Sequence, residues 1–464
     1  MTMWSPTLAA RTGPRYRALV EALAQDVAEG RLPAGARLPP QRDLAYRLGV
    51  TIGTVSRAYA LAAQRGLVIG EVGRGTFVRN DAAAPTGRLN PVSDGADDLI
   101  KLTVNAPPDP YYGAALAERL AELAARPGAT VDLWAYTPKA GFLEHRAAAA
   151  RWIGGVGLEA APERTIITGG AHQAIVVAFA ALARPGDRVL IESLTYAGVC
   201  HVAERCGVRL HGLAMDDEGL LPDALDAACR ADGARLLFVN PTAHNPTTAT
   251  MSRARREAIV ALARQHDLIV IEDDVYGRLP AERPPPLAAL APERTVYIGS
   301  AAKSVAPGLR FGVLLSPQHL LQRIADAQHD LFLTCPPLMA ELFTHLLRDG
   351  TAEQLAARQR QEAAARQRLA RDVLGAQAYL AHPTSYHLWL SLPPPWRTTE
   401  FIEEVAQRGV AIDPATAFAV DRARAPHAVR VSLSAAASHD RLRRGLLVLA
   451  ETLDEMPPRR REVI

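Results

Sequence analysis

From about residue 100 onward, short apolar runs alternate with stretches of helical spacing, and this alternation limits the possible folds more than any other feature of the chain. The apolar runs cover residues 164–168, 188–192, 236–240, 268–273 and 295–299. Runs this apolar between helices predict buried and mostly parallel strands, and therefore an α/β domain. Ligands of such sheets bind at the carboxyl ends of the strands, so the residues after each run are candidates for a site.

Polar residues and glycines follow each of these runs. In chain order they are Gly170, Ala171 and His172, then Tyr196, then Asn245, then Asp273 and Tyr276, then Ser300, Lys303 and Arg310. A helix expected over residues 172–183 starts at the glycines, and the free N–H groups of such a start can hold an anion. Each residue alone also fits a turn, a strand-end cap or a surface charge, so only the ordered set indicates a ligand.

Lysine is nearly absent from this chain. Only Lys101, Lys139 and Lys303 occur, and the other 49 basic residues are arginines. An amine can lose its proton and attack a carbonyl, whereas a guanidinium cannot. Lys303 does not fit a P-loop, because that motif requires glycine where Tyr297 and Ala302 stand. Lys303, at a strand end, is therefore a candidate for covalent chemistry.

Together these residues match the parts of pyridoxal 5'-phosphate (PLP). The expected partners are Gly170, Ala171, Ser300 and Arg310 for the phosphate, Asp273 for the ring nitrogen, Asn245 and Tyr276 for the phenolic oxygen, and Lys303 for the aldehyde. PLP proteins hold the cofactor as a Schiff base on a lysine and place an acid at the pyridine nitrogen. An Asp carboxylate there keeps the ring protonated and strengthens it as an electron sink.

The same residues, in order, resemble a fold-type I aminotransferase. The matching segments are residues 136–141, 170–173, 196, 245–247, 273–276, 300–303, 307–310 and 429–432. The resemblance implies a large PLP-dependent transferase domain with a mostly parallel central sheet, a small C-terminal α+β subdomain and Lys303 as the catalytic residue. It also implies that His172 belongs to the cofactor site and that Tyr196 stacks on the ring. Tyr136 would reach the cofactor phosphate of a neighbouring subunit, and Arg430 would clamp the α-carboxylate of an amino acid.

Two positions depart from the aminotransferase pattern. Thr248 stands where many members have glycine, and Ala302 stands where a second hydroxyl often precedes the lysine. The first departure affects the loop on the substrate side, and the second removes a possible phosphate contact. Neither removes the cofactor, but both leave catalytic competence open.

The first 80 residues carry eleven arginines against five acidic residues, which indicates a polyanionic partner for this part of the chain. Helical spacing covers residues 14–31, a second helix starts at about Pro40, and Thr51 could cap a third. Apolar runs at 66–69 and 76–78 then flank a glycine-rich turn. This order is that of a winged helix–turn–helix, whose third helix lies in the major groove of DNA. The candidates for base edges are Thr51, Gly53, Thr54 and Ser56, and those for phosphates and the wing are Arg42, Arg57 and Arg74.

Residues 37–45, 48–51, 54–55, 58–59 and 73–78 resemble the DNA-binding domain of the GntR family. A trihelical protein-interaction module with solvated arginines is the alternative. We assign residues 12–79 to the winged helix–turn–helix, residues 80–98 to a linker without apolar periodicity, and residues 99–455 to the aminotransferase-like domain.

A GntR-type head joined to an aminotransferase-like body resembles the MocR subfamily of transcription regulators. The resemblance implies a regulator that binds a double-stranded DNA operator, holds PLP at Lys303, senses PLP or an amino acid or amine effector, and forms a head-to-tail homodimer. Two alternatives remain open: an active aminotransferase with an accessory head, and a repressor whose body only dimerises and has lost PLP. Asp273, Asn245, Lys303 and Arg310 argue against the last.

Several classes are not expected. No apolar run approaches the roughly 18 residues of a membrane span, and the N-terminus lacks the pattern of a signal peptide. The four cysteines show no CxxC spacing, and no His pair has zinc-finger spacing, so we expect no metal site. We expect a cytoplasmic protein.

Overall fold

The computed structural model describes residues 14–29, 31–33, 35–64, 67–71, 75–78, 99–125 and 132–455, together with Trp4 and Pro6. The chain divides into two compact units, Met1–Arg88 and Leu89–Ile464, each described here by itself. The predicted linker 80–98 and the predicted wing residue Arg74 lie outside the described residues.

The described residues of the small unit form three helices and a two-stranded antiparallel sheet. The elements are α1 (Arg15–Ala28), α2 (Gln41–Leu48), α3 (Ile52–Gln64), β1 (Val68–Glu71) and β2 (Gly75–Val78). Their apolar faces share one core that includes Leu19, Leu23, Leu44 and Val55. Gly49 ends α2 at φ +60°, a conformation that glycine adopts without a steric penalty. This order of elements confirms the predicted winged helix–turn–helix, although α1 ends before the predicted residue 31.

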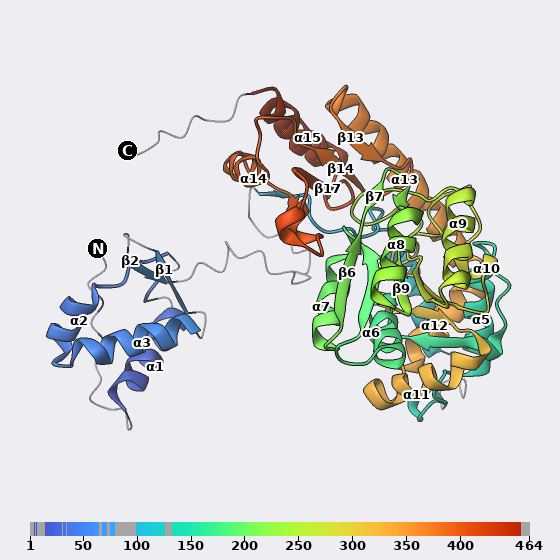
Figure 1. The fold of residues 1–464 in the computed structure, drawn as a ribbon, viewed down its shortest axis with the longest axis horizontal. Helices are drawn as coiled ribbons and strands as arrows, with labels where there is room; N and C mark the ends of the chain where they lie inside the picture. The colour runs from blue at the N-terminus through green and yellow to red at the C-terminus, as the bar shows by residue number, and fades with distance from the viewer. Residues whose placement is uncertain are drawn as a thin grey trace. The chain divides into compact units, whose positions relative to one another are not determined.

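The large unit is built on a seven-stranded sheet in the order β4-β12-β11-β10-β9-β5-β6, of which Figure 1 labels β6 and β9. The strands are β4 (Thr165–Thr168), β5 (Arg188–Glu192), β6 (Arg209–Leu213), β9 (Leu236–Val239), β10 (Ile269–Asp273), β11 (Thr295–Ser300) and β12 (Gly312–Leu315). β12 pairs antiparallel with both of its neighbours, and the other pairings are parallel. The predicted mostly parallel sheet is therefore confirmed, while β6 and β12 were not predicted.

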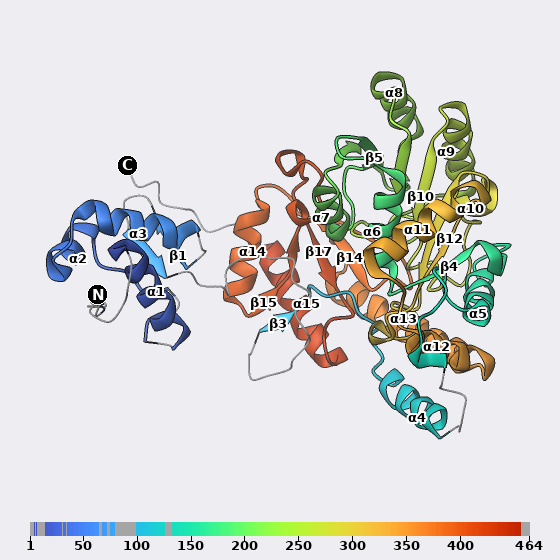
Figure 2. The ribbon, with the colours of Figure 1, turned by 90° about the horizontal axis from the view of Figure 1, so that it is seen from below.

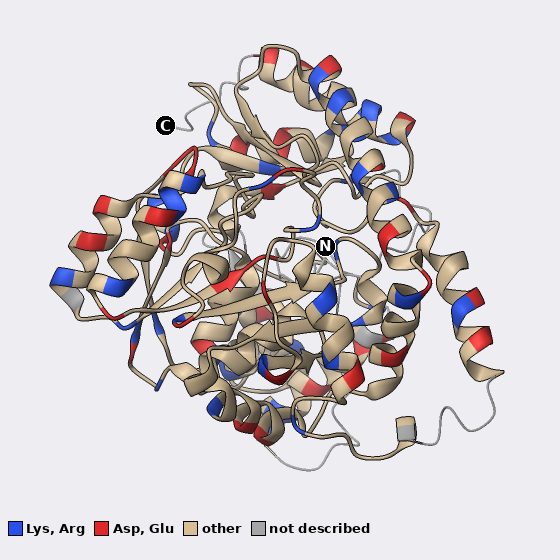
Figure 3. Ribbon diagram, turned by 90° about the vertical axis from the view of Figure 1, so that its right-hand side faces the viewer, with Lys and Arg blue, Asp and Glu red and all other residues tan. Residues whose placement is uncertain are grey.

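Helices cover both faces of this sheet. The helices of the large unit are α4 (Tyr112–Ala124), α5 (Leu143–Gly154), α6 (Ala171–Leu182), α7 (Ala197–Arg205), α8 (Pro222–Asp232), α9 (Arg253–Gln265), α10 (Leu287–Leu290), α11 (Leu321–Phe332), α12 (Pro337–Arg348), α13 (Thr351–Leu374), α14 (Thr398–Gln407) and α15 (His439–Asp454). Consecutive residues of one strand point to opposite faces of the sheet and reach different cores. Ile191 packs with α6, α7 and α11, and Leu190 packs with α8, α9 and α10. This double cover explains why the strands are apolar on both sides. In Figure 3, basic and acidic residues are interspersed on the helices.

A second, four-stranded sheet forms the core of the C-terminal subdomain. Its order is β13-β14-β17-β16, from β13 (Tyr379–Ala381), β14 (His387–Ser391), β17 (Ala428–Ser432) and β16 (Asp413–Pro414). The core of this subdomain combines residues of β14 and β17 with residues of α13, α14 and α15. The predicted small α+β subdomain is confirmed. A further hairpin joins β7 (Met215–Asp216) and β8 (Gly219–Leu220).

The start of the large unit belongs to this subdomain as well. β3 (Ile100–Lys101) pairs in parallel with β15 (Val410–Ala411), and Figure 2 shows the two strands side by side. The Arg441 guanidinium donates to the carbonyl oxygen of Leu99 at 2.8 Å. The chain is therefore attached to the C-terminal subdomain at the first residues that follow the predicted linker.

Within the described residues, none of the helices combines the length and the apolar character that crossing a membrane requires.

Candidate functional site

The predicted site residues lie at one edge of the seven-stranded sheet. Asp273 and Ser300 are the last residues of β10 and β11, and Lys303 follows three residues later. Because β12 is antiparallel to β11, its first residue, Gly312, pairs with Ser300, and Arg310 lies just before it. The sheet topology therefore brings both sides of the β11–β12 connection to the carboxyl edge of the parallel strands, where ligands of such sheets bind.

Lys303 is the partly buried lysine of the three. Its Nζ donates to the backbone oxygen of Asn105 at 2.5 Å, whereas Lys101 is exposed and Lys139 pairs with Asp326 at 2.7 Å. Burial, followed by the charge of Arg430, lowers the pKa of Lys303 to about 8. A much larger fraction of this amine is therefore neutral near pH 7 than of an ordinary lysine, as a nucleophilic amine requires.

Asn105 connects three residues of the site, and the sequence did not suggest it. Besides accepting from Lys303 through its backbone oxygen, it donates from Nδ2 to the Tyr276 hydroxyl at 3.2 Å and to His387 Nδ1 at 2.8 Å. The Tyr386 hydroxyl donates to the Lys303 carbonyl oxygen. Asn105 precedes a Pro-Pro pair in a loop, so nothing in the local pattern indicated its burial. Only its contacts, distant in sequence, place it in the site.

Asp273 lies almost fully buried behind this group. Burial raises the pKa of Asp273 to about 7, the neighbouring Asp274 adds to the rise, and Lys303 opposes it. A carboxyl group with this pKa needs a cationic partner to stay ionised at neutral pH. A protonated pyridine nitrogen is such a partner, so the environment of Asp273 fits the predicted role.

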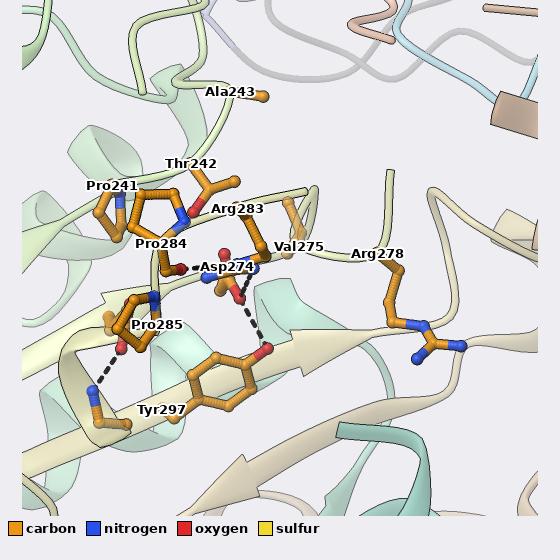
Figure 4. Close-up of polar contacts among 12 residues, drawn as sticks. Pro241, Thr242, Ala243, Asp274, Val275, Arg278, Arg283, Pro284, Pro285 and Tyr297 are labelled. Carbon is orange, nitrogen blue, oxygen red and sulfur yellow. Dashed lines mark hydrogen bonds and ion pairs between the residues drawn. The ribbon is translucent and has the colours of Figure 1, made fainter. Parts of the chain in front are cut away.

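The loop after Asp273 is held by a buried ion pair (Figure 4). The Asp274 carboxylate accepts from Arg283 Nη1 at 2.6 Å and from the Tyr297 hydroxyl at 2.8 Å. Arg283 also donates to the Pro284 carbonyl oxygen at 3.3 Å. Removing one partner of such a buried pair leaves the other charge uncompensated. These contacts fix the direction in which the chain leaves β10, and thus the position of Tyr276.

The opposite end of the site combines a helix start with an arginine. Gly170 precedes α6 at φ +100° and makes no side-chain cap, so the first N–H groups of α6 can serve an anion. A Cβ atom on Gly170 would lie 2.6 Å from Arg310 Nη2, and one on Gly312 would lie 2.5 Å from the Gly170 carbonyl carbon. The two glycines thus permit a close approach of Arg310 to the helix start, which fits a phosphate.

The remaining predicted cofactor residues are placed unevenly. His172 and Tyr196 meet edge to face, with ring centroids 6.3 Å apart. Burial raises the pKa of Tyr196, so its hydroxyl is neutral at physiological pH. The Ser300 hydroxyl donates to the Phe311 carbonyl oxygen at 3.0 Å, so it must turn before it can donate to a phosphate. Tyr136 is 89% exposed on this chain, as a residue that serves a neighbouring subunit would be.

Arg430 is buried and already engaged. Its Nη1 donates to Asn245 Oδ1 at 2.8 Å, and its Nη2 donates to the Thr103 carbonyl oxygen at 2.5 Å and to Asp413 Oδ2 at 2.6 Å. The Phe418 ring lies 4.5 Å from the guanidinium carbon. Sequence reasoning missed Asp413, and its signal was an acidic residue at the end of an apolar run.

The loop that carries Asn245 also carries one of the two departures from the family pattern. The Asn245 amide oxygen accepts from Arg430, so the amide nitrogen is the group of this side chain that is left to donate to a ligand. Thr248 adopts φ +66°, a region that disfavours β-branched residues. Glycine would adopt this conformation without strain, which explains why a glycine is frequent there in the resembling family.

In the small unit, the predicted DNA-contacting residues lie around α2 and the start of α3. The side chains of Arg42, Thr51, Ser56 and Arg57 are exposed, as is Gly53. Thr54 is half-buried, and its N–H donates to Thr51 Oγ1 at 3.2 Å, which confirms Thr51 as the cap of α3. Tyr46 on α2 is 90% exposed as well.

Two family descriptions cover most of the chain. Aminotransferase class I and II matches residues 97–449, and bacterial regulatory proteins of the gntR family match residues 15–78. YdeF of Bacillus subtilis, an uncharacterized HTH-type transcriptional regulator, is 31% identical over 98% of this chain and 97% of its own length. The chain belongs to the MocR subfamily. As a MocR protein it is a transcription regulator with a GntR-type DNA-binding domain and the fold of a PLP-dependent family.

Solved structures show the same relationship for the large unit of this MocR protein. An archaeal alanine:glyoxylate aminotransferase superposes with a TM-score of 0.70 and 26% identity, over 77% of this chain and 91% of its own. LysN, an α-aminoadipate aminotransferase from Thermus thermophilus, superposes with a TM-score of 0.69 and 25% identity, over 77% and 92%.

Proposed function

We propose that the large unit binds PLP at Lys303, and that an amine effector at this site changes how a homodimer engages its DNA operator in the cytoplasm. The observation that carries the proposal is a lysine with a lowered pKa at the edge of an aminotransferase-type sheet, in a chain that also has a DNA-binding head. We further propose the domain limits 12–79, 80–98 and 99–455, and a head-to-tail arrangement of the two subunits.

Residues at both ends of the site support PLP as the ligand. The start of α6 with Gly170, Ala171 and Arg310 would hold the phosphate, and Asp273 would face the ring nitrogen. When bound, PLP supplies an aldehyde that joins an amine covalently and a ring that withdraws electrons from it. The chain's own contribution is to lower the pKa of the Lys303 amine, to position this amine against Asn105, and to keep Asp273 out of water.

The proposed homodimer is supported by exposed aromatic residues of the large unit. Trp134, Tyr136 and Tyr111 are 76%, 89% and 52% exposed. Large exposed aromatic groups of this kind are enriched at protein interfaces. A dimer would also present two DNA-binding heads to two half-sites.

The cofactor proposal is tested by adding PLP to the purified full-length protein and recording the visible spectrum. Borohydride should then fix PLP to the peptide that contains Lys303, and Lys303→Ala should prevent this. Amines are next added one by one while DNA affinity is measured. An effector should change that affinity by roughly 5- to 150-fold, the usual range of coupling between sites. Absence of fixed PLP would refute the cofactor proposal.

Aminotransferase activity is the second candidate, favoured by the retained set of Asp273, Asn245, Lys303 and Arg310. In that case Lys303, once free of the cofactor, would move the α-proton as a general base. Sustained turnover of an amino acid with a keto acid would favour this reading. A stable change in the spectrum without turnover would favour the sensor.

The DNA contact of α3 is tested with Arg57→Ala. If Arg57 neutralises a phosphate, DNA affinity should fall and the slope of log K against log salt should become shallower by about 1. Arg17→Ala, an exposed arginine on α1, is the matched control and should leave the slope unchanged. Equal slopes for Arg57→Ala and the wild type would remove Arg57 from the DNA interface.

A further inference from the structure

The guanidinium of Arg430 is neutralised by a carboxylate of its own chain. Asp413 on β16 and Arg430 on β17 are directly opposite in the antiparallel register, and their side chains form an ion pair of 2.6 Å. Directly opposed residues of an antiparallel pair project from the same face of the sheet. Asp413 and Arg430 therefore project from the same face of the sheet, where Arg430 also contacts Asn245.

The donors of Arg430 are distributed so that no carboxylate fork remains. A guanidinium can grip a carboxylate in the plane with two parallel N–H groups, either Nη1 and Nη2 or Nε and Nη2. Both arrangements need a hydrogen of Nη2. The two hydrogens of Nη2 are already used, one by the Thr103 carbonyl oxygen and one by Asp413. Nε is buried without a hydrogen-bond partner among the described residues, but it cannot form a fork by itself.

Other approaches to Arg430 are also restricted. The Phe418 ring covers one face of the guanidinium at 4.5 Å. One of the two hydrogens of Nη1 is donated to Asn245, at 2.8 Å, and the other cannot form a fork by itself. A ligand carboxylate in the plane would therefore have to displace Asp413, whose side chain is 25% exposed, or come to rest beside it with like charge.

We propose that Asp413 is a specificity-determining residue: it occupies Arg430 in place of a ligand's α-carboxylate, so the site accepts amines that lack this group in preference to α-amino acids. This inference rests on the proposed PLP site. It replaces the expected role of Arg430 as a clamp for an amino acid with a role as the fixed partner of Asp413. The effector class is then a primary amine without a carboxylate on the carbon next to nitrogen.

Two stable adducts test the proposal without any reaction. N-(5'-phosphopyridoxyl)-L-alanine and N-(5'-phosphopyridoxyl)ethylamine differ only by the α-carboxylate, so the ratio of their Kd values isolates its contribution. Calorimetric titration of the PLP-free, full-length protein should show the ethylamine adduct binding at least as tightly as the alanine adduct. Asp413→Asn should improve the alanine adduct by about tenfold relative to the ethylamine adduct, because it removes the negative charge that neutralises Arg430 and would repel the ligand carboxylate.

The outcomes separate the two levels of inference. Asp217→Asn removes an exposed carboxylate of the same unit and should leave the ratio unchanged. A wild-type preference of tenfold or more for the alanine adduct would overturn the role of Asp413, and this measurement needs no variant. An Asp413→Asn ratio equal to that of the wild type would overturn it as well. If neither adduct binds, the PLP site itself is wrong and the inference falls with it.

Discussion

The two arginines of the site stand in opposite situations. Arg310 is exposed at the start of α6, where its Nη2 donates to the Gly169 carbonyl oxygen at 2.9 Å. Arg430 is 8% exposed and is engaged by Asn245, Thr103 and Asp413. The first has N–H groups left for a ligand, whereas the second has spent both hydrogens of Nη2 within the chain. The proposed phosphate end of the site is thus open to an incoming anion, whereas the other end already contains the Asp413 carboxylate.

A retained arginine therefore does not by itself show which partner it has in the folded chain. From the sequence both residues matched the aminotransferase pattern. The structure distinguishes them by burial and by the partners of Arg430, among which Asp413 carries the opposite charge. A charged site residue must therefore be judged together with the charges that the fold places beside it.

The largest expected effect comes from removing each arginine in turn. Arg310→Leu should weaken PLP binding by roughly 100-fold, because charged hydrogen bonds to a phosphate contribute about 1.5–3 kcal/mol each. Arg430→Leu should change PLP affinity by less than about threefold, because Arg430 is occupied within the chain and is not one of the proposed phosphate contacts. Absorbance titration measures both, with Arg323→Leu, an exposed arginine on α11, as the control. Equal losses of PLP affinity in both variants would contradict the difference between Arg310 and Arg430.

The second prediction concerns pH. Because the neutral Lys303 amine attacks and its pKa is lowered to about 8, the rate of PLP attachment should fall about tenfold per pH unit below 8 and level off above it. Arg430 is the charge that contributes most to this lowering, and Arg310 contributes less. Arg430→Leu should therefore move the midpoint to higher pH by more than Arg310→Leu does. Stopped-flow absorbance at fixed PLP measures the midpoints, and a reversed order would contradict the geometry.

The smallest expected effect comes from removing the hydrogen bond between the Tyr386 hydroxyl and the backbone of Lys303. Tyr386→Phe removes the hydrogen bond to the Lys303 carbonyl oxygen and should lower the free energy of unfolding by about 1 kcal/mol. For a unit of this size the Tm should fall by about 1 to 2 °C, while PLP affinity stays within about twofold. Tyr379→Phe on β13 is the control, since its hydroxyl makes no hydrogen bond within the part of the chain described. An unchanged Tm would show that the contact does not contribute.

The sequence predicted what depends on local pattern. Apolar runs predicted five of the seven strands, and strand ends pointed to Asp273 and Lys303, because the topology of a parallel sheet determines where such residues meet. β12 was missed because its four residues follow the Lys303 loop without helical spacing between. Asn105, Tyr386 and Asp413 were missed because each acquires its role from a contact more than 15 residues away in the chain, as the bond between Asn105 and Lys303 illustrates. Their types are ordinary, and even the position of Asp413 at the end of an apolar run does not identify Arg430 as its partner.

The pairing of β3 with β15 has a mechanical consequence for a regulator. β15 ends two residues before Asp413. The residues of β3, which follow the predicted linker, and Asp413 are therefore carried by the same subdomain. The Ile100 N–H donates to the Gly409 carbonyl oxygen at 2.7 Å, and the Leu102 N–H donates to the Ala411 carbonyl oxygen at 2.8 Å. These bonds fix the direction of residues 100–102 relative to the subdomain. A ligand that moved this subdomain would therefore also move residues 100–102, with no need for a relay through the large sheet.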